Sequence, residues 1–449
     1  MNRRRILLLS GFYYPDSVGG TEKYVHLLGT DLEAQGFEVV IAAPSEDEQE
    51  HDYQYAGLRV HRYPVALDPE RAEVRGDVPP RYMDRFATWL GELAPDLVHM
   101  HSLTRGCGYW HAREVKARGI PLIMTVHVPS VTCAQGSMLR WGTTDCDGVM
   151  RERRCTACFL QARGLPRSAA WPVAMLPRPI AAAAAERPEV GLARLGLRSV
   201  IADRHARTRD LFALADRVVA VADWLSEVLR RNGCDPAKLL VSRHGLADED
   251  VRCSRKARPA RPSNGRLELG YVGRLDRVKG IDRVIAAFGR VDPALPIRLT
   301  IFGTARGDEQ LAYAASLRRM AGADERIVFG GELTPMNRAE VLAGLDALVV
   351  PSLWFETGPL VVLEAFGAGI PVIGTRRGGI AELVADGVSG ILVDGGTPEA
   401  WAAVLESAYR RYASGEWHWS MPPVRSSQQV GYEMRLVYES VLGQQKRAA

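Results

Sequence analysis

Short runs rich in valine, isoleucine and leucine recur along this chain with helix-length segments between them, and they form two series. Runs of this kind, alternating with helices, are typical of parallel sheets that are buried on both faces. Since 449 residues are too many for one ordinary hydrophobic core, the two series predict two doubly wound α/β domains. The expected strands are 5–10, 38–44, 58–64, 96–101, 121–128, 217–222 and 239–245 in the first series, and 267–274, 297–303, 326–331, 347–352, 371–375 and 390–395 in the second.

The segment between the two series, VRCSRKARPARPSNG (251–265), is basic, rich in proline and serine, and without apolar periodicity. That composition is typical of a linker. We therefore predict an N-terminal domain over 1–250 and a C-terminal domain over 266–420. The amphipathic stretch QQVGYEMRLVYESVL (428–442) follows a proline-rich turn and predicts a final helix within 421–449.

Charge and hydropathy argue against several classes of protein. A net charge of +4 is mild for this length, which argues against dedicated nucleic-acid binding. No run approaches the ~20 apolar residues that span a bilayer. The apolar run after Arg3-Arg4-Arg5 is too short for a signal peptide. Seven cysteines, an odd number, argue against a disulfide framework. We expect a cytoplasmic protein.

The stretch 351–374, PSLWFETGPLVVLEAFGAGIPVIG, combines two carboxylates with a short helix between two buried strands. Thr357 can cap that helix, and Pro359 suits its first turn. Glu356 precedes the helix, whereas Glu364 lies in an apolar run, where an unpartnered carboxylate costs on the order of several kcal/mol. The helix N-terminus also offers free N–H groups and a partial positive charge. The stretch therefore predicts a site for a phosphorylated sugar. The alternative is a capped core helix whose glutamate bonds to backbone.

Two cations stand in a glycine-flanked turn at the start of the second series, in GYVGRLDRVKGID (270–282). Arg274 and Lys279 are framed by Gly273 and Gly280. Because the turn follows a buried strand, the planar guanidinium and the compact ammonium can reach one anion from two sides. A pair of solvated surface cations is the alternative.

The first series offers a glycine loop and a histidine at strand ends. In GFYYPDSVGGTEKYV (11–25), Gly19 and Gly20 permit close approach of a ligand, and Thr21 can cap the next helix. The loop is not G-x-G-x-x-G, which weakens a dinucleotide interpretation. His127 ends an expected strand, where ligands of open α/β sheets gather; a structural histidine is the alternative.

The spacing Glu-x7-Glu followed by AFGAGIPVIGT resembles the signature of the retaining nucleotide-sugar glycosyltransferases of family 4, which have the GT-B fold. The double-glycine loop, His127 and the Arg274–Lys279 turn match that family in the same order, and His244-Gly245 stands where it usually has Asn-Gly. The resemblance covers roughly 5–45 and 210–400. It implies two Rossmann-like domains facing each other across a cleft, with the last helix crossing back onto the first domain.

The resemblance also implies the reaction. A sugar would pass from a UDP- or GDP-sugar to a hydroxyl of a sugar, glycolipid or small-molecule acceptor, with retention of anomeric configuration and no catalytic metal, in polysaccharide, glycolipid or natural-product biosynthesis. It assigns the diphosphate to Arg274 and Lys279, the sugar to Glu356 and the ribose to Glu364. The expected catalytic residues are Glu356, His127, Arg274 and Lys279, and the expected donor-binding residues are Gly19, Gly20, Gly273, Arg274, Lys279, Gly303, Glu332, Gly358, Leu360, Val361 and Glu364.

Four cysteines cluster in a segment outside the family pattern, about 129–205, with spacings x12, x8 and x2. Four thiolates within so short a segment could close a tetrahedral zinc site, which would supply folding energy that the segment lacks. Reduced structural or redox cysteines, and disulfides, are the alternatives. Some family members carry a similar insertion. The residues concerned are Cys133, Cys146, Cys155 and Cys158.

The rest of this insertion, 162–205, is rich in alanine, proline and arginine and predicts helices. Its apolar and basic side chains could form a surface for anionic lipid, and hence a peripheral membrane contact; ordinary helix packing is the alternative. The residues of that surface would be Arg167, Trp171, Met175, Leu176, Arg178 and Ile180.

Three other functions are alternatives to the one that the resemblance implies. A metal-dependent transferase of another fold would need a D-x-D motif, but neither Asp145-Cys-Asp147 nor Asp248-Glu-Asp250 ends an expected strand. The same fold also serves nucleotide-sugar epimerases or hydrolases. A non-catalytic sugar-nucleotide-binding subunit would not need the full set of cations and carboxylates described above.

Overall fold

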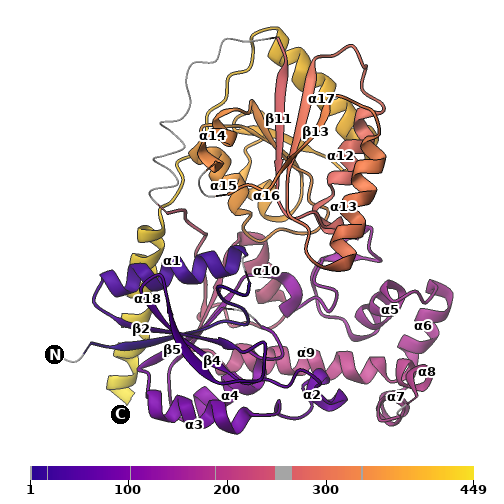
Figure 1. The fold of residues 1–449 in the computed structure, drawn as a ribbon. Helices are drawn as coiled ribbons and strands as arrows, with labels where there is room; N and C mark the ends of the chain where they lie inside the picture. The colour runs from indigo at the N-terminus through magenta and orange to yellow at the C-terminus, as the bar shows by residue number, and fades with distance from the viewer. Residues whose placement is uncertain are drawn as a thin grey trace. The chain divides into compact units, whose positions relative to one another are not determined.

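The structure is a computed structural model of the chain, and it describes residues 3–17, 19–101, 103–187, 189–247, 265–334 and 337–448. The chain forms two compact units (Figure 1). Unit 1 comprises Met1–Arg243 and Gln428–Ala449, and unit 2 comprises His244–Ser427. The expected linker, apart from Gly265, lies outside the described residues, as does the second D-x-D triplet.

Unit 1 is built on an eight-stranded sheet with the order β10-β9-β6-β5-β1-β2-β4-β3. All seven strands expected in the first half are present. The antiparallel edge strand β3 was not predicted, because its sequence HDYQY is polar and largely exposed. The strands are β1 Arg5–Leu9, β2 Glu38–Pro44, β3 His51–Tyr55, β4 Leu58–Tyr63, β5 Leu97–Met100, β6 Leu122–Val126, β9 Arg217–Ala220 and β10 Leu239–Val241.

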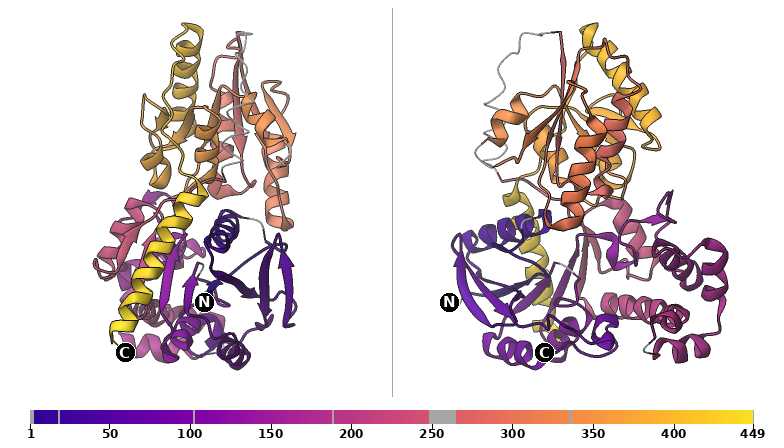
Figure 2. Two further views of the ribbon diagram at one scale, coloured as in Figure 1. Left: turned by 90° about the vertical axis from the view of Figure 1, so that its left-hand side faces the viewer. Right: turned by 45° about the vertical axis from the view of Figure 1, so that its right-hand side comes forward.

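Helices cover both faces of this sheet, and successive residues of β1 supply the two cores because strand side chains alternate. Leu7 and Leu9 pack with α3, α4, α9 and α10, whereas Ile6 and Leu8 pack with α1 and the C-terminal helix α18 (Figure 2). The helices are α1 Gly20–Ala34, α2 Arg71–Arg75, α3 Met83–Leu93, α4 Tyr109–Ala117, α9 Leu197–Leu214, α10 Asp223–Arg231 and α18 Ser427–Ala448.

The segment between β6 and α9 forms an irregular loop followed by four short helices, which Figure 1 shows grouped beside one end of α9. A small core of Ala157, Leu160, Ala170 and Ala174 joins α5 to α6. The elements are a 3₁₀ turn Pro129–Val131, β7 Leu139–Arg140, β8 Thr144–Asp145, α5 Glu152–Ala162, α6 Arg167–Met175, α7 Arg178–Ala185 and α8 Val190–Leu195.

Unit 2 is a six-stranded, wholly parallel sheet with the order β13-β12-β11-β14-β15-β16, and all six expected strands are present. α12, α13 and α17 pack on one face, and α14, α15 and α16 on the other. The strands are β11 Leu267–Val272, β12 Ile297–Phe302, β13 Ile327–Gly331, β14 Ala347–Val350, β15 Val372–Thr375 and β16 Gly390–Val393. The helices are the 3₁₀ turn Arg277–Lys279, α12 Ile281–Phe288, α13 Gly307–Ala321, α14 Arg338–Ala343, α15 Leu360–Gly367, α16 Gly378–Leu383 and α17 Pro398–Ala413.

Each sheet has one point at which the direction of strand addition reverses. In unit 2 it lies between β11 and β14, and in unit 1 between β1 and β5. Ligands of open α/β sheets bind beyond the carboxyl ends of strands at such points. The loops after these strands are therefore the expected ligand-binding loops of the two units. Within the described part of the chain, no helix combines the length and the hydrophobicity that crossing a bilayer requires.

Candidate active site

The reversal point of unit 2 brings Lys279 and Glu356 into direct contact. Lys279 ends the 3₁₀ turn after β11, and Glu356 lies in the loop after β14. The Nζ of Lys279 lies 2.6 Å from Oε1 of Glu356. Ser352, also buried, donates its hydroxyl to the same oxygen at 2.7 Å. Two residues of the predicted site, 77 positions apart in the chain, thus form one ion pair.

This ion pair fixes the charge of Glu356. Its side chain is buried, and burial alone would raise its pKa. The ammonium group of Lys279, together with hydrogen bonds from Lys279 and Ser352, outweighs that effect and holds the pKa of Glu356 below its ordinary value. The carboxylate is therefore ionised at neutral pH, and it can bind hydroxyl groups or face a developing positive charge.

The turn that carries Lys279 approaches the end of β14 closely because Gly280 has no side chain. Gly280 has φ +69°, and a Cβ there would lie 2.2 Å from the carbonyl oxygen of Pro351. The amide of Leu353 donates to the carbonyl of Val278 at 2.8 Å. The backbone contact between the two loops therefore sets the distance between Lys279 and Glu356.

The helix after Glu356 begins at Leu360, with Pro359 as its N-cap and no side-chain cap. The prediction that Thr357 caps this helix is wrong, because the helix begins three residues later and the proline-led turn takes the capping position. The amides of Leu360 and Val361 belong to the first turn, where N–H groups lack helical acceptors. They follow Glu356 directly and can bind an anion beside it.

Glu364 lies on α15 and is mostly buried, with 11% of its side chain exposed. Its partner is Arg338 at the start of α14, whose Nη1 lies 2.8 Å from Oε1. The expectation that the buried carboxylate meets a partner is confirmed, and this partner is a cation. Arg338 itself was not predicted, because nothing in the sequence near it marks the pairing.

Gly358 and His244 are in direct contact, and the contact requires a glycine at position 358. The Nδ1 of His244 hydrogen-bonds the carbonyl oxygen of Gly358 at 3.1 Å, so Nδ1 carries the proton. A Cβ on Gly358 would lie 2.4 Å from that nitrogen. Burial lowers the pKa of His244 to about 4. His244 is therefore neutral at pH 7, and it holds the loop between Glu356 and α15.

The other predicted residues of unit 2 lie at the same edge of the sheet. Gly273 and Gly303 directly follow β11 and β12, and a Cβ on Gly303 would lie 2.5 Å from the carbonyl oxygen of Gly273. Arg274 is exposed, and no ion pair of its guanidinium with a described residue is present. Glu332 follows β13 directly and is also exposed. The arrangement leaves Arg274 available for an external anion.

In unit 1 the glycine loop leads into α1, which begins at Gly20 with Gly19 as N-cap. The prediction that Thr21 caps α1 is wrong, because the helix begins one residue before it. The carboxylate of Glu22 folds back over Gly19, where a Cβ would lie 2.6 Å from Oε2, and it accepts a hydrogen bond from Ser17 at 2.6 Å.

His127 follows β6 and is buried among aromatic rings. Its Nε2 lies 3.3 Å from Nδ1 of His101, which follows β5, and Tyr24 of α1 meets its ring edge-on at 4.9 Å between centroids. His127 therefore lies against α1, the helix that follows the glycine loop. Tyr24 and His101 were not predicted.

A third histidine lies beneath this pair. His99 is wholly buried in β5, where one ring nitrogen contacts Thr125 at 2.7 Å and the other contacts the hydroxyl of Tyr438 of α18 at 2.6 Å. Burial lowers the pKa of His99 to about 3 and that of His101 far below its ordinary value. Both rings are neutral at pH 7.

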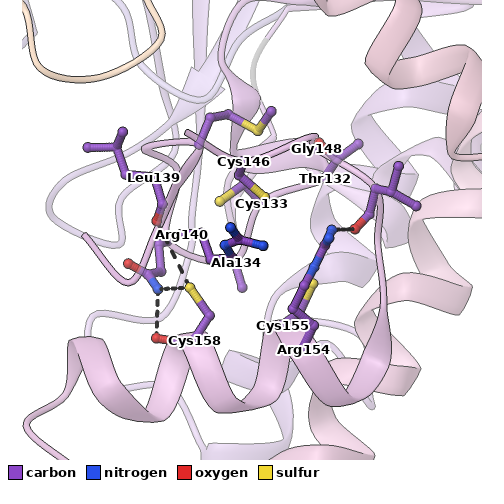
Figure 3. Close-up of a pocket in the computed structure, with 13 residues that line it drawn as sticks. Thr132, Cys133, Ala134, Leu139, Arg140, Cys146, Gly148, Arg154, Cys155 and Cys158 are labelled. Carbon is purple, nitrogen blue, oxygen red and sulfur yellow. Dashed lines mark hydrogen bonds between the residues drawn. The ribbon is translucent and has the colours of Figure 1, made fainter. Parts of the chain in front are cut away.

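The four clustered cysteines line one cavity of about 30 Å³ in the loop before α5 and in α5 itself (Figure 3). All four are free thiols. Burial raises the pKa of Cys155 to about 11 and that of Cys146 and Cys158 above the ordinary value. Asp147 of the first D-x-D triplet is bound by Arg154, with Nη1 2.9 Å from Oδ2.

Two family models match this chain. Residues 19–245 match the glycosyl transferase 4-like domain, and residues 266–411 match the glycosyl transferases group 1. The chain belongs to the glycosyl transferase 4-like family. It is therefore a transferase of sugars, and the charged groups at the reversal point of unit 2 are its candidate donor site.

Several curated relatives of this chain carry the same name. The D-inositol 3-phosphate glycosyltransferase of Rhodococcus opacus (strain B4) is 26% identical over 435 residues, which cover 90% of this chain and 82% of the relative. The enzyme of that name from Segniliparus rotundus is 35% identical over 210 residues, 44% of this chain and 45% of the relative.

Solved structures share the GT-B fold with this chain. Sucrose-phosphate synthase from Thermosynechococcus elongatus has a TM-score of 0.61 at 20% identity, covering 99% of this chain and 98% of that one. Anabaena HepE in complex with UDP has a TM-score of 0.59 at 14% identity, covering 99% of each chain. Arabidopsis starch synthase IV bound to ADP and acarbose has a TM-score of 0.61 at 14% identity, covering 98% of this chain and all of that one.

Proposed function

We propose that this glycosyltransferase moves a sugar from a nucleoside diphosphate sugar to a hydroxyl acceptor, with retention of anomeric configuration. The observation that carries the proposal is the ion pair of Lys279 and Glu356 at the reversal point of unit 2. Arg274, which is exposed, precedes Lys279 by five residues, and the first turn of α15 begins four residues after Glu356. The loops that carry this buried carboxylate and its partner thus also carry a second cation and free N–H donors.

Cleavage of the donor at its anomeric carbon leaves negative charge on the departing diphosphate. An enzyme accelerates that step when it stabilises this charge more strongly in the transition state than in the bound donor. Arg274, Lys279 and the amides of Leu360 and Val361 are the groups for that task. Removing one such donor typically costs about 3 kcal/mol of barrier.

The two glutamates divide the remaining work. Glu356 is ionised, so it can hold sugar hydroxyls and stabilise positive charge developing on the sugar ring. Glu364, held by Arg338, is assigned to the ribose hydroxyls. With one oxygen of Glu356 engaged by Lys279 and Ser352, we assign it an orienting role rather than that of a covalent nucleophile. Retention would then follow from attack on the face that the diphosphate leaves.

The relatives suggest which donor and acceptor to test first. Solved neighbours hold UDP or UDP-glucose in Anabaena HepE. The curated relatives are named for D-inositol 3-phosphate. We therefore place a UDP-sugar donor and an inositol phosphate acceptor first, with GDP-sugars and with sugar or glycolipid acceptors next.

The decisive experiment is a panel of nucleotide sugars offered to the purified chain, with thermal shift as the first measurement. A donor at 100 times its dissociation constant should raise the free energy of unfolding by about 2.7 kcal/mol. The matching donor is then incubated with each acceptor, and product is identified by mass spectrometry and NMR. Absence of stabilisation by every donor would contradict the proposal. Release of free sugar without acceptor transfer would favour a hydrolase.

A peripheral membrane contact is a separate part of the proposal. Trp171, Met175 and Ile180 of α6 and α7 are 41%, 49% and 55% exposed. Exposed apolar side chains beside arginines are suited to an anionic lipid surface. Co-sedimentation with vesicles of neutral lipid, with and without phosphatidylglycerol, tests this. Binding should require the anionic lipid and should fall when Trp171 and Ile180 are both changed to serine.

A further inference from the structure

We propose that Cys133, Cys146, Cys155 and Cys158 bind one structural Zn²⁺ ion, which braces the loop following His127. The four cysteines come from three places in unit 1: the loop after the 3₁₀ turn Pro129–Val131, the loop after β8, and α5. All four line a single cavity of about 30 Å³ (Figure 3). That volume is sufficient for a species the size of one water molecule.

The chemistry of the lining favours zinc over other ions. Soft thiolates select zinc and iron–sulfur clusters, whereas magnesium and calcium prefer oxygen ligands. A cavity of this size is small for a cluster. Cys155 and Cys158 stand three apart on α5, the C-x-x-C spacing of structural zinc sites with four cysteines.

Hydrogen-bond donors already point at the sulfurs. The Sγ of Cys158 accepts from the amide of Trp141 at 3.3 Å. It also accepts from Nε2 of Gln135 at 2.9 Å, a contact drawn as a dashed line at Cys158 in Figure 3. The backbone of Gly148 hydrogen-bonds Cys146. Such donors stabilise thiolates and orient them as metal ligands. Gly148 has φ +72°, and a Cβ there would lie 2.7 Å from side chains of Met138 and Val228, so the turn depends on glycine.

Metal binding would change both the protonation and the net charge of this site. Four thiols that bind Zn²⁺ release four protons to solvent, and the resulting site carries a net charge of −2. Arg140 and Arg154 line the same cavity. The Nε of Arg140 is buried and has no hydrogen-bond partner among the described residues. Since Arg154 is already paired with Asp147, Arg140 is the cation that would offset part of the charge that metal binding creates.

Binding must draw the loops inward. Among the described residues, no three histidine, cysteine or acidic side chains stand in an arrangement that could hold a metal ion without movement. Two of the thiols, Cys155 and Cys158, are fixed on α5, so the loops carrying Cys133 and Cys146 would close the site. Cys133 lies six residues after His127, and its amide donates to the carbonyl of Pro129 at 2.9 Å. The metal would therefore tie α5 to the loop that leaves β6.

The test uses the full chain, expressed with zinc and purified with a non-thiol reductant. Elemental analysis should find one zinc per chain. Replacement by Co²⁺ should give the thiolate charge-transfer and d–d absorption bands of a tetrahedral sulfur site. Cys133→Ser, Cys146→Ser, Cys155→Ser and Cys158→Ser should each lose the metal. Cys234→Ala, a buried cysteine that does not line the cavity, should keep it.

The wild-type chain alone can overturn the proposal, so a variant that fails to fold does not leave it untested. A reduced chain that contains no zinc and gives no cobalt–thiolate bands excludes the site. Disulfides between these cysteines in the chain as isolated, found by mass spectrometry, would also exclude it. The metal content and the cobalt spectrum do not depend on glycosyl transfer, so this test and that of the proposed function can fail separately.

Discussion

The two units hold buried titratable groups at the carboxyl ends of their sheets in opposite ways. In unit 2 the two buried carboxylates are charged, and each has a cation beside it: Glu356 with Lys279, and Glu364 with Arg338. In unit 1 the buried histidines His99 and His101 are neutral, and they hydrogen-bond a threonine, a tyrosine and a third histidine.

The difference predicts different weaknesses. A buried ion pair is costly to break from one side, because the remaining charge is left without a partner. A network of neutral buried histidines is stable at neutral pH. In acid the unfolded chain takes up protons that the folded network does not, so the free energy of unfolding falls. Unit 2 should therefore respond to the loss of single charges, and unit 1 to pH.

The largest effect expected is on activity, when the charge of Glu356 is removed without a change of shape. Glu356→Gln should lower kcat by about 100-fold to 1,000-fold, because one interaction with the transition state is typically worth about 3 to 4 kcal/mol. The measurement is the steady-state rate with the donor found by the panel. Glu399→Gln, at an exposed surface pair with Arg290, is the control and should keep its rate within about twofold. A near-normal rate for Glu356→Gln would remove this residue from the mechanism.

The second effect is on stability. Arg338→Ala removes the cation from the mostly buried carboxylate of Glu364 and should cost about 2 to 3 kcal/mol of stability. The expected cost is at the low end because Arg338 is 28% exposed. Urea unfolding of the full chain, followed by fluorescence, measures it. The double variant Arg338→Ala/Glu364→Leu should recover most of the loss. Arg435→Ala, at an exposed pair with Glu439, should cost no more than about 0.5 kcal/mol. Equal losses for the two arginine variants would contradict the contrast.

The third effect concerns acid. The folded-state pKa of His99 is about 3, below the 6.5 of the unfolded chain. Its stability contribution is thus constant above pH 6.5, and falls as pH drops from 6.5 toward 3, by about 1.4 kcal/mol per pH unit. His101 should add a similar slope. Urea midpoints between pH 7 and pH 5 measure the slope. It should become shallower in His99→Leu and stay unchanged in His51→Gln, which alters an exposed histidine.

The smallest effect tests the positioning of the donor loop. His244→Ala removes one hydrogen bond to Gly358 and should cost about 1 kcal/mol of stability. It should raise KM for the donor more than it lowers kcat, because the loop still carries Glu356. His244→Asn, which keeps a side-chain donor, should recover part of the KM. An unchanged KM in the alanine variant would show that the loop is held without His244.

The strands were predictable because each core strand is a short apolar run, and all thirteen expected ones are present. The strands that sequence reasoning missed, β3, β7 and β8, have no such run. Both helix caps assigned to threonine were wrong, because glycine and proline occupy those positions in the described helices. A capping residue can be chosen from sequence only when the first helical residue is known.

The site was predictable as a set of chemical groups but not as a set of pairs. Arg274, Lys279, Glu356 and Glu364 stand out locally, whereas the contact of Lys279 with Glu356 depends on two loops that the sheet brings together. Arg338 carries no local signal. His99 and His101 offered one: two histidines two residues apart in an apolar strand must share a face, and their ring centroids lie 3.9 Å apart.

Because the chain returns to unit 1 through α18, unit 2 is a continuous segment inserted between the two sequence pieces of unit 1. Chain segments enter and leave unit 2 side by side, since Leu246 and Ser427 pair through their backbones at 2.7 Å. Within unit 1, Ser242 donates to Glu433 at 2.7 Å, so its two sequence pieces also meet. Residues 244–427 therefore form one continuous unit whose two ends meet, and the two sequence pieces of unit 1 meet in the same way. Removal of α18, by contrast, would take Val430, Met434 and Tyr438 out of the core of unit 1. The strands that form this core lie far from α18 in the sequence.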